Sequence, residues 1–336
     1  MNEVTLMRCV LALLIVFMHA FTCYNHSWRE PMGFVEIPLY KWLARISLAF
    51  TLEAFVFISG YLFAFQRISL NKKKGAISLI SNKLKRLILP SAIFSGVYFV
   101  VFQQYTSIGD LLSSLINGCG HLWFLPMLFW CFIGGWLLEQ IEVGYGWKIL
   151  FLILLNLFMF YSLPLRLSNA CSFMVYFYGG FVAYKYSDKI KETISLSRLI
   201  RGWLLFVIVF ALFRPLRDVL VCSDDASKLY KFAMVVGDNA CQLLYAGVGT
   251  WVFYLTAVCY TQRIKLKAFI SKLAACCFGI YIFQQFALQL LYYKTSFPLM
   301  VGPYGLPWCG FTFAAITSCF LTLLMLKTKL GRYILG

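Results

Sequence analysis

Hydrophobic positions along the chain gather into long runs that short polar segments separate. Apolar runs of about twenty residues, the length that a helix needs to cross a bilayer, recur over the whole sequence. In lipid the backbone must satisfy its own hydrogen bonds, so such runs form helices or a closed barrel. A barrel would show segments of about ten residues with alternating polarity, whereas these runs are continuous. The pattern therefore predicts an all-α, polytopic membrane protein.

The same pattern predicts about ten transmembrane helices, with both termini in the cytoplasm. They cover approximately residues 5–24, 43–66, 87–104, 121–141, 147–163, 170–186, 202–221, 239–261, 273–293 and 309–326. The first run lacks a small-residue cleavage site, so we expect a retained span rather than a cleaved signal. With no linker, repeat or soluble segment in the sequence, we expect a single transmembrane domain over residues 1–336 and no appended soluble domain.

The charged residues of the chain predict how the protein is oriented in the membrane, and they leave the predicted helices unchanged. Charged residues make up 13% and hydrophobic residues 61% of the sequence, where soluble domains have about 25% charged residues. A net charge of +17 would also suit a nucleic-acid-binding protein, so the placement of the charges decides. With the spans above, 21 of the 30 Lys and Arg residues fall on the cytoplasmic side and 9 on the outer side. This asymmetry orients membrane proteins, so we expect the lipid bilayer, and no nucleic acid, as partner.

The first span carries two ionisable side chains, Arg8 and His19, in an otherwise apolar run. A helix turns by about 100° and rises by about 1.5 Å per residue, which places the two on one stripe about 16 Å apart. Ionisable groups inside a membrane are costly and usually face a protein interior or a hydrated path. The twelve cysteines, by contrast, show no C-x-x-C or ligand-like spacing. We interpret them as packing residues and expect no metal.

Several motifs in order resemble those of the acyltransferase-3 family of integral membrane acyltransferases, which includes bacterial surface-polysaccharide O-acetyltransferases. The matching residues are Arg8 and His19 with ten residues between them, 57–62, 83–90, 121–125 and Phe278-Gly279-Ile280-Tyr281. The resemblance implies transfer of an acyl group, acetyl by default, from cytoplasmic acetyl-CoA. The acceptor would be a hydroxyl of a surface or lipid-linked glycan at the outer face of the cell (inner) membrane. A homo-oligomer is possible.

The chain departs from the family pattern at two places. Gln284 and Gln285 stand where many relatives have a late-helix His, which weakens any proton-transfer role there. Glu53 replaces a Pro in the second span, where a carboxylate is expensive and would pair with a cation from another helix. Ser59 and Gly60, close by, are interpreted as small residues that permit close helix packing.

The resemblance and the residue chemistry together assign candidate roles. His19 is the proposed catalytic base, since His exchanges a proton near neutral pH. Arg8 would bind the donor or orient the catalytic helix; otherwise it is a positive-inside anchor. His121 would bind the acceptor or polarise the thioester carbonyl; otherwise it is an interfacial residue beside Trp123. We assign four side chains to substrate binding, namely Trp123, Glu53, Tyr281 and Gln284.

The basic segment before the third span is the candidate donor site. Lys83, Lys85 and Arg86 would hold the phosphates of coenzyme A, whose charged head cannot enter lipid. The other interpretation is that they set the topology and meet anionic lipid, as we expect of Lys72, Lys73 and Lys74. Two further functions stay open. The chain would be a transporter or flippase for a glycan or small acid without chemistry, or an inactive relative that scaffolds polysaccharide assembly.

Overall fold

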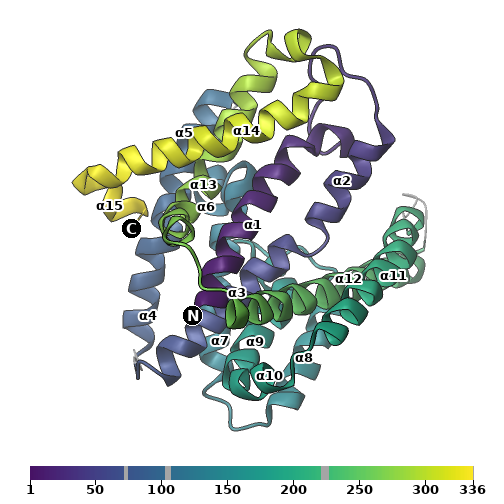
Figure 1. Ribbon diagram of the computed structural model, residues 1–336, viewed down its shortest axis with the longest axis vertical. Coiled ribbons are helices and arrows are strands. Elements are labelled where there is room, and N and C mark those ends of the chain that lie inside the picture. Colours follow the sequence, from purple (N-terminus) through teal and green to yellow (C-terminus); the bar gives the residue numbers. More distant parts are fainter. Residues whose placement is uncertain (72–74, 103–106, 221–226, 336) are drawn as a thin grey trace. The chain divides into compact units, whose positions relative to one another are not determined.

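The computed structural model describes residues 1–71, 75–102, 107–220 and 227–335 (Figure 1). In these residues every regular element is a helix and none is a strand, which confirms the all-α prediction. Lys72, Lys73 and Lys74, which we expected to strengthen the cytoplasmic charge, lie outside the described residues.

Eight helical segments in the described part of the chain are long and apolar enough to cross a membrane. They are Asn2–Ala20, Pro38–Ile68, Ala76–Phe102, Gly120–Leu138, Leu196–Val219, Lys228–Arg263, Ala268–Tyr293 and Phe297–Lys327. The two remaining predicted spans correspond to α8 (Tyr145–Leu157), an apolar helix of 13 residues, and α9 (Leu167–Lys185), of 19 residues. The chain is thus a multi-pass membrane protein, and its orientation stays a prediction.

The helices form two compact units, and unit 1 combines three separate stretches, Met1–Thr51, Ile88–Trp123 and Leu266–Gly336. Its elements are α1 (Asn2–Ala20), η1 (Thr22–Asn25), α2 (Pro38–Leu48), α5 (Leu89–Phe102), α6 (Ile108–Asn117), η3 (Gly120–Trp123), α13 (Ala268–Tyr293), α14 (Phe297–Lys327) and α15 (Lys329–Leu335). The first helix, α1, packs against α13 and α14 from the other end of the sequence. Two segments almost 270 residues apart therefore share one core, which α5 and η3 join.

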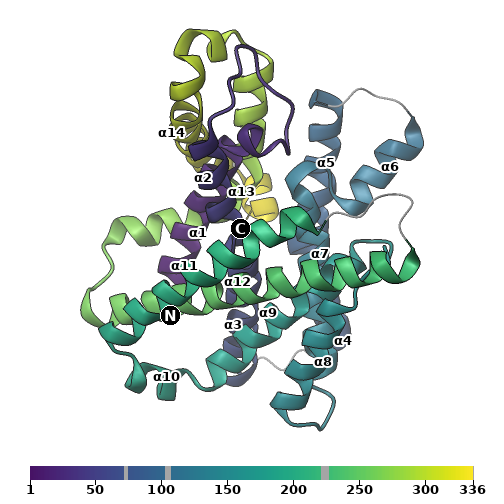
Figure 2. The ribbon, with the colours of Figure 1, turned by 90° about the vertical axis from the view of Figure 1, so that its right-hand side faces the viewer.

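Unit 2 combines Leu52–Leu87 with Phe124–Lys265. Its elements are α3 (Thr51–Ile68), α4 (Ala76–Lys83), η2 (Leu84–Ile88), α7 (Phe124–Leu138), α8, α9, α10 (Ser187–Thr193), α11 (Leu196–Val219) and α12 (Lys228–Arg263). The long helices α11 and α12 lie side by side (Figure 2). Helix α3 crosses α9 so closely that a side chain on Gly60 would collide with the carbonyl of Phe177. This confirms close packing at Gly60. The expectation of a single domain stays a prediction.

Two predicted boundaries differ from the structure. The first span ends at Ala20 rather than near residue 24, because the chain tightens into the 3₁₀ turn η1. The segment rich in Pro and Gly before residue 309 is helical rather than a loop. Pro298 lies in the first turn of α14, where proline is tolerated. Gly302, with φ of 67° and ψ of 171°, is not helical, so α14 consists of two helical segments that meet there at a kink.

Candidate active site

His19 lies in the last turn of α1, and the turn that follows the helix brings a tryptophan back over it. After η1, His26 adopts φ of 61°, and the Ser27 N–H donates to Asn25 Oδ1 at 3.0 Å. This local turn returns Trp28 to the end of α1, where its ring stacks on the His19 ring. The two ring centres are 5.8 Å apart and the ring planes differ by 13°. The sequence did not predict Trp28 as a site residue. Its only indication there was Asn25, a residue type that favours the turn by which Trp28 comes back to His19.

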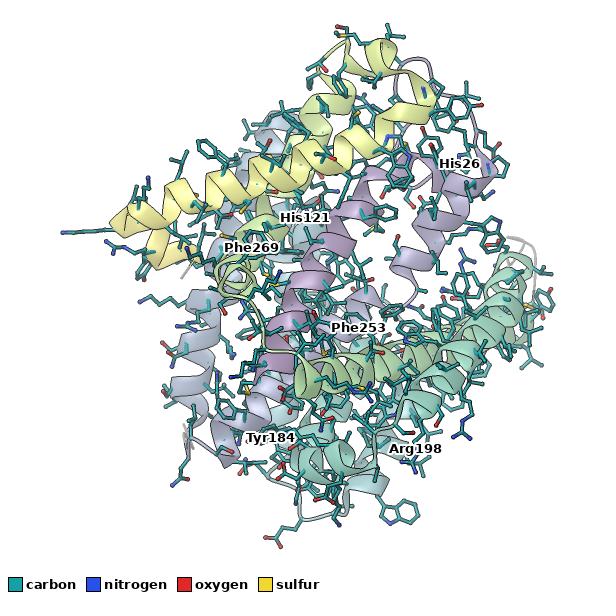
Figure 3. The ribbon with its side chains drawn as sticks, in the orientation of Figure 1. His26, His121, Tyr184, Arg198, Phe253 and Phe269 are labelled. Carbon is teal, nitrogen blue, oxygen red and sulfur yellow. The ribbon has the colours of Figure 1, made fainter. Side chains whose placement is uncertain are left out.

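His121 reaches the same place through a tight turn between α6 and α7. Gly118 and Gly120 both have positive φ, 77° and 54°. Ser95 on α5 fixes the turn, because its Oγ accepts from the Cys119 N–H at 2.9 Å. A Cβ on Gly120 would lie 2.9 Å from Gln285 Oε1, so the glycine lets α13 approach closely. The backbone thus delivers His121 to the wall of α13 (Figure 3).

Carbonyl oxygens of α13 engage both ring nitrogens of His121. Nδ1 contacts Gln285 Oε1, which also accepts from the His121 backbone N–H at 2.9 Å, and Nε2 lies 3.0 Å from the Ile282 carbonyl. The Tyr281 hydroxyl donates to the His121 carbonyl at 2.6 Å. A neutral imidazole carries one N–H, so one of these nitrogens donates a hydrogen bond and the other only lies against an oxygen. Both nitrogens of His121 are therefore taken up by contacts with α13.

His19 is in a different state, although its ring is only 6.1 Å from that of His121, at an angle of 71°. Its Nδ1 is buried and has no hydrogen-bond partner. Gln284 of α13 is fully buried, and its side-chain amide lies within hydrogen-bonding reach of the His19 ring. Buried polar atoms without partners are rare in folded proteins. The arrangement leaves one nitrogen, on His19, able to accept a proton.

Arg8 lies about three turns nearer the start of α1 and is half-buried. Its Nη2 donates to the carbonyl of Ala274 on α13, at 3.3 Å. This bond ties the two helices that carry His19 and Gln284. The contact suits the predicted role of Arg8 in orienting the catalytic helix.

The remaining substrate candidates fall in different places. Trp123 ends η3, two residues after His121, and is half-buried. Glu53 belongs to unit 2 and is 3% exposed. Its Oε1 accepts from the amide of Gln242 on α12 at 3.0 Å, and the positive charge of Arg217 on α11, another helix, acts on the same carboxylate.

A cavity of about 350 Å³ opens beside the two histidines within unit 1. Its lining comes from the loop after η1, from α5, from Gly120 and from the end of α13, and consists of Ser27, Trp28, Arg29, Tyr98, Phe102, Gly120, Gln285, Gln289, Tyr293 and Lys294. Trp28, which stacks on His19, and Gln285, which holds His121, both belong to this wall. We call it the aromatic cavity.

A second pocket, of about 180 Å³, lies within unit 2. It is lined by Phe63, Gln66, Arg67, Leu79, Asn82, Lys83 and Arg86. We call it the basic pocket, since it gathers three cations and no acidic side chain. Of the predicted donor residues it contains Lys83, whose Nζ lies 3.3 Å from the centre of the Phe132 ring, and Arg86, but not Lys85. Sequence reasoning did not include Arg67, which the end of α3 brings to Lys83 from sixteen residues away.

Comparisons with known proteins identify the family of the chain. No group of three or more His, Cys, Asp or Glu side chains in the described ranges is placed to hold a metal ion. No curated protein and no solved structure matches the chain. The family model of an acyltransferase domain, however, matches residues 1–327, nearly the whole sequence. The chain therefore belongs to the acyltransferase-3 family, and it is a membrane acyltransferase.

Proposed function

We propose that this protein transfers an acyl group, acetyl by default, from cytoplasmic acetyl-CoA to a hydroxyl of a surface or lipid-linked glycan. The reaction takes place at the outer face of the cell (inner) membrane. The observation that carries the proposal is the buried, unpartnered Nδ1 of His19 beside His121, in a chain of an acyltransferase family.

His19 supplies the proton chemistry of this reaction. As the acceptor oxygen attacks the thioester carbonyl carbon, His19 Nδ1 accepts the hydroxyl proton. The C–O bond forms and the C–S bond breaks, and the departing thiolate takes the proton back from His19. The ring therefore returns to its first state without another reactant. Burial beneath Trp28 limits access of water, which would otherwise compete as acceptor.

His121 acts in this scheme as a positioning residue. Because its ring nitrogens both contact oxygen atoms of α13, it holds η3 against that helix, with its ring centre 6.1 Å from that of His19. Tyr281 supports the same arrangement through the His121 carbonyl. Gln284, whose side-chain amide lies within hydrogen-bonding reach of His19, would orient that ring or bind the acceptor hydroxyl.

The basic pocket is the proposed site for the phosphates of the donor. One guanidinium group donates two parallel hydrogen bonds to two oxygens of a phosphate, and a lysine adds a compact positive charge. Arg67, Lys83 and Arg86 provide this set, and the Gln66 and Asn82 side chains add amide donors. Lys85 stays a candidate for contact with the donor or with anionic lipid.

The decisive experiment compares two histidines of unit 1. His19→Gln and a matched variant, His26→Asn, are purified and incubated with radiolabelled acetyl-CoA and the cell's own surface glycan. His26 is an exposed loop residue in the left-handed conformation, which Asn tolerates. We expect His19→Gln to lose about 10²–10⁴-fold in transfer rate, as removal of a general base does. His26→Asn should stay near the wild-type rate.

Size-exclusion chromatography and thermal unfolding check that both variants fold. Wild-type transfer by a folded His19→Gln protein would reject the role of His19. Glycan translocation without any labelled product, by the wild-type protein, would instead support the transporter.

A further inference from the structure

The walls of the aromatic cavity carry three kinds of chemistry at once. Aromatic rings come from Trp28, Tyr98, Phe102 and Tyr293, and amides from Gln285 and Gln289. The charged side chains of the lining are Arg29 and Lys294, both cations, and none of the lining residues is acidic. Ligand sites commonly combine apolar and aromatic walls with a few convergent polar groups. The positive charges of Arg29 and Lys294 then favour a ligand with a negative group.

Rings and amides in this combination suit a sugar. The apolar face of a pyranose packs on an aromatic ring, and its hydroxyls exchange hydrogen bonds with amide groups, which both donate and accept. Tyr and Trp suit sites that are partly apolar and partly hydrated, since each has a broad apolar ring face and one group that forms hydrogen bonds. The volume of about 350 Å³ lies near the lower end for ligand pockets, so the cavity holds one part of a larger saccharide.

Arg29 is fixed at the rim of this cavity although it is exposed. Its guanidinium lies 4.3 Å from the centre of the Tyr293 ring, and the Tyr293 hydroxyl donates to the Arg29 carbonyl at 2.7 Å. Lys294 follows Tyr293 directly and is also exposed. A guanidinium packed over a ring still has N–H groups that can bind a carboxylate or phosphate.

The acidic side chains of the same loop do not neutralise this rim. Glu30 follows Arg29 in the sequence but is not part of the cavity wall. Glu36 faces other side chains, since its Oε1 lies 3.9 Å from Lys41 Nζ and 3.8 Å from His26 Nε2. The cavity therefore keeps a positive rim over an aromatic wall.

We propose that the acceptor is an anionic saccharide. Its carboxylate or phosphate lies on Arg29 and Lys294, and its sugar ring packs against Trp28 and Tyr293. The proposal rests on the proposed function, because it names the substrate class of the same site. A ligand in this position is adjacent to the chemistry, since Trp28 also stacks on His19 and Gln285 also holds His121.

Direct binding tests the proposal without any acyl donor. Calorimetry with the purified full chain compares a hexuronate oligosaccharide, the same oligosaccharide with its carboxyl groups reduced to alcohols, and a phosphate-bearing oligosaccharide. We expect the protein to bind at least one anionic form about 10-fold or more tightly than the neutral one, as charge-assisted bonds to a fixed Arg do. Preference for one anionic form identifies the acceptor's charged group as carboxylate or phosphate.

Two double variants locate the effect. Arg29→Gln with Lys294→Gln should reduce the preference for the anionic form to less than about 2-fold and leave binding of the neutral form unchanged, because the aromatic wall is intact. Lys327→Gln with Lys329→Gln removes the same charge from exposed positions elsewhere and should keep the preference. Equal binding of charged and neutral forms by the wild type, or a preserved preference in the first variant, would overturn the proposal.

The His19→Gln variant separates this result from the proposed function. It should bind the anionic saccharide as the wild type does, yet fail to acylate it. Selective binding together with wild-type transfer by that variant supports the acceptor class and rejects the role of His19.

Discussion

The aromatic cavity and the basic pocket use cations in different ways. The basic pocket of unit 2 places three cations around about 180 Å³, with amides and little aromatic surface. The aromatic cavity of unit 1 has twice that volume, about 350 Å³, four aromatic rings and two cations. Dense charge suits the phosphates of a nucleotide-like donor, whereas sparse charge over rings suits a saccharide with a single negative group.

The comparison also separates two roles of Lys and Arg in a membrane protein, which are orientation in the bilayer and binding of an anion in a cavity. Most Lys and Arg residues of this chain are explained by orientation in the bilayer. Those in a cavity differ because neighbouring helices fix their geometry. Lys83 lies against the Phe132 ring and Arg29 against the Tyr293 ring, so both lose less freedom when an anion binds. The first prediction separates these two kinds of cation.

The largest effect is expected from removing two cations of the basic pocket. Lys83→Gln with Arg86→Gln should raise the KM for acetyl-CoA about 100-fold, since each charge-assisted contact contributes about 1.5–3 kcal/mol. The KM for acetyl-pantetheine, which lacks the nucleotide phosphates, should not change. Arg263→Gln with Lys265→Gln is the matched control, because both side chains are exposed in unit 2 and neither lines the pocket. Steady-state kinetics with both donors measures the effect, and an equal rise for both would place the phosphates elsewhere.

A smaller effect is expected at the turn that carries His121 to the aromatic cavity. Gly120→Ala should lower the free energy of unfolding by about 1–2 kcal/mol, because φ of 54° disfavours a side chain. Its Cβ would also lie 3.1 Å from the Tyr98 ring, so the turn and His121 shift and transfer slows.

Gly146→Ala provides the comparison within unit 2. A Cβ there meets nothing within 4 Å, and Gly146 lies inside α8, where alanine is the better helix former. Thermal unfolding should therefore show a loss of stability for Gly120→Ala and no loss for Gly146→Ala. The transfer rate should fall in the first variant and stay at the wild-type value in the second. If Gly120→Ala leaves both quantities unchanged, the turn does not fix the site.

The smallest effect is expected at the aromatic wall itself. Trp28→Phe keeps a ring over His19 but reduces its area, so the KM for the glycan acceptor should rise about 3-fold. The KM for acetyl-CoA should stay constant, in contrast to the basic-pocket variants. Kinetics with each substrate varied in turn makes the measurement. A rise in the donor KM alone would assign this cavity to the donor instead.

Much of the fold was predictable from sequence because its signals are local. The length of an apolar run and the absence of charge within it are enough to identify a membrane helix, and the all-α class and the family were both confirmed. The kinked α14 was not predicted, since Gly302 and its neighbouring prolines resemble a loop until a packed helix supports them. The candidate roles of His19, Arg8 and His121 stay predictions, and only their placement is now described.

The sequence by itself determined the membrane class, the acyltransferase family and the presence of Arg8 and His19 on one helix, because these depend on residues near one another along the chain. Only the tertiary structure brought His121 to His19, Arg67 to Lys83, and Trp28 with Gln285 to one cavity. The physical reason is that these pairs meet through turns and helix crossings. Ser95, Gly120 and the carbonyls of α13 set that geometry, and no periodicity in the sequence encodes it.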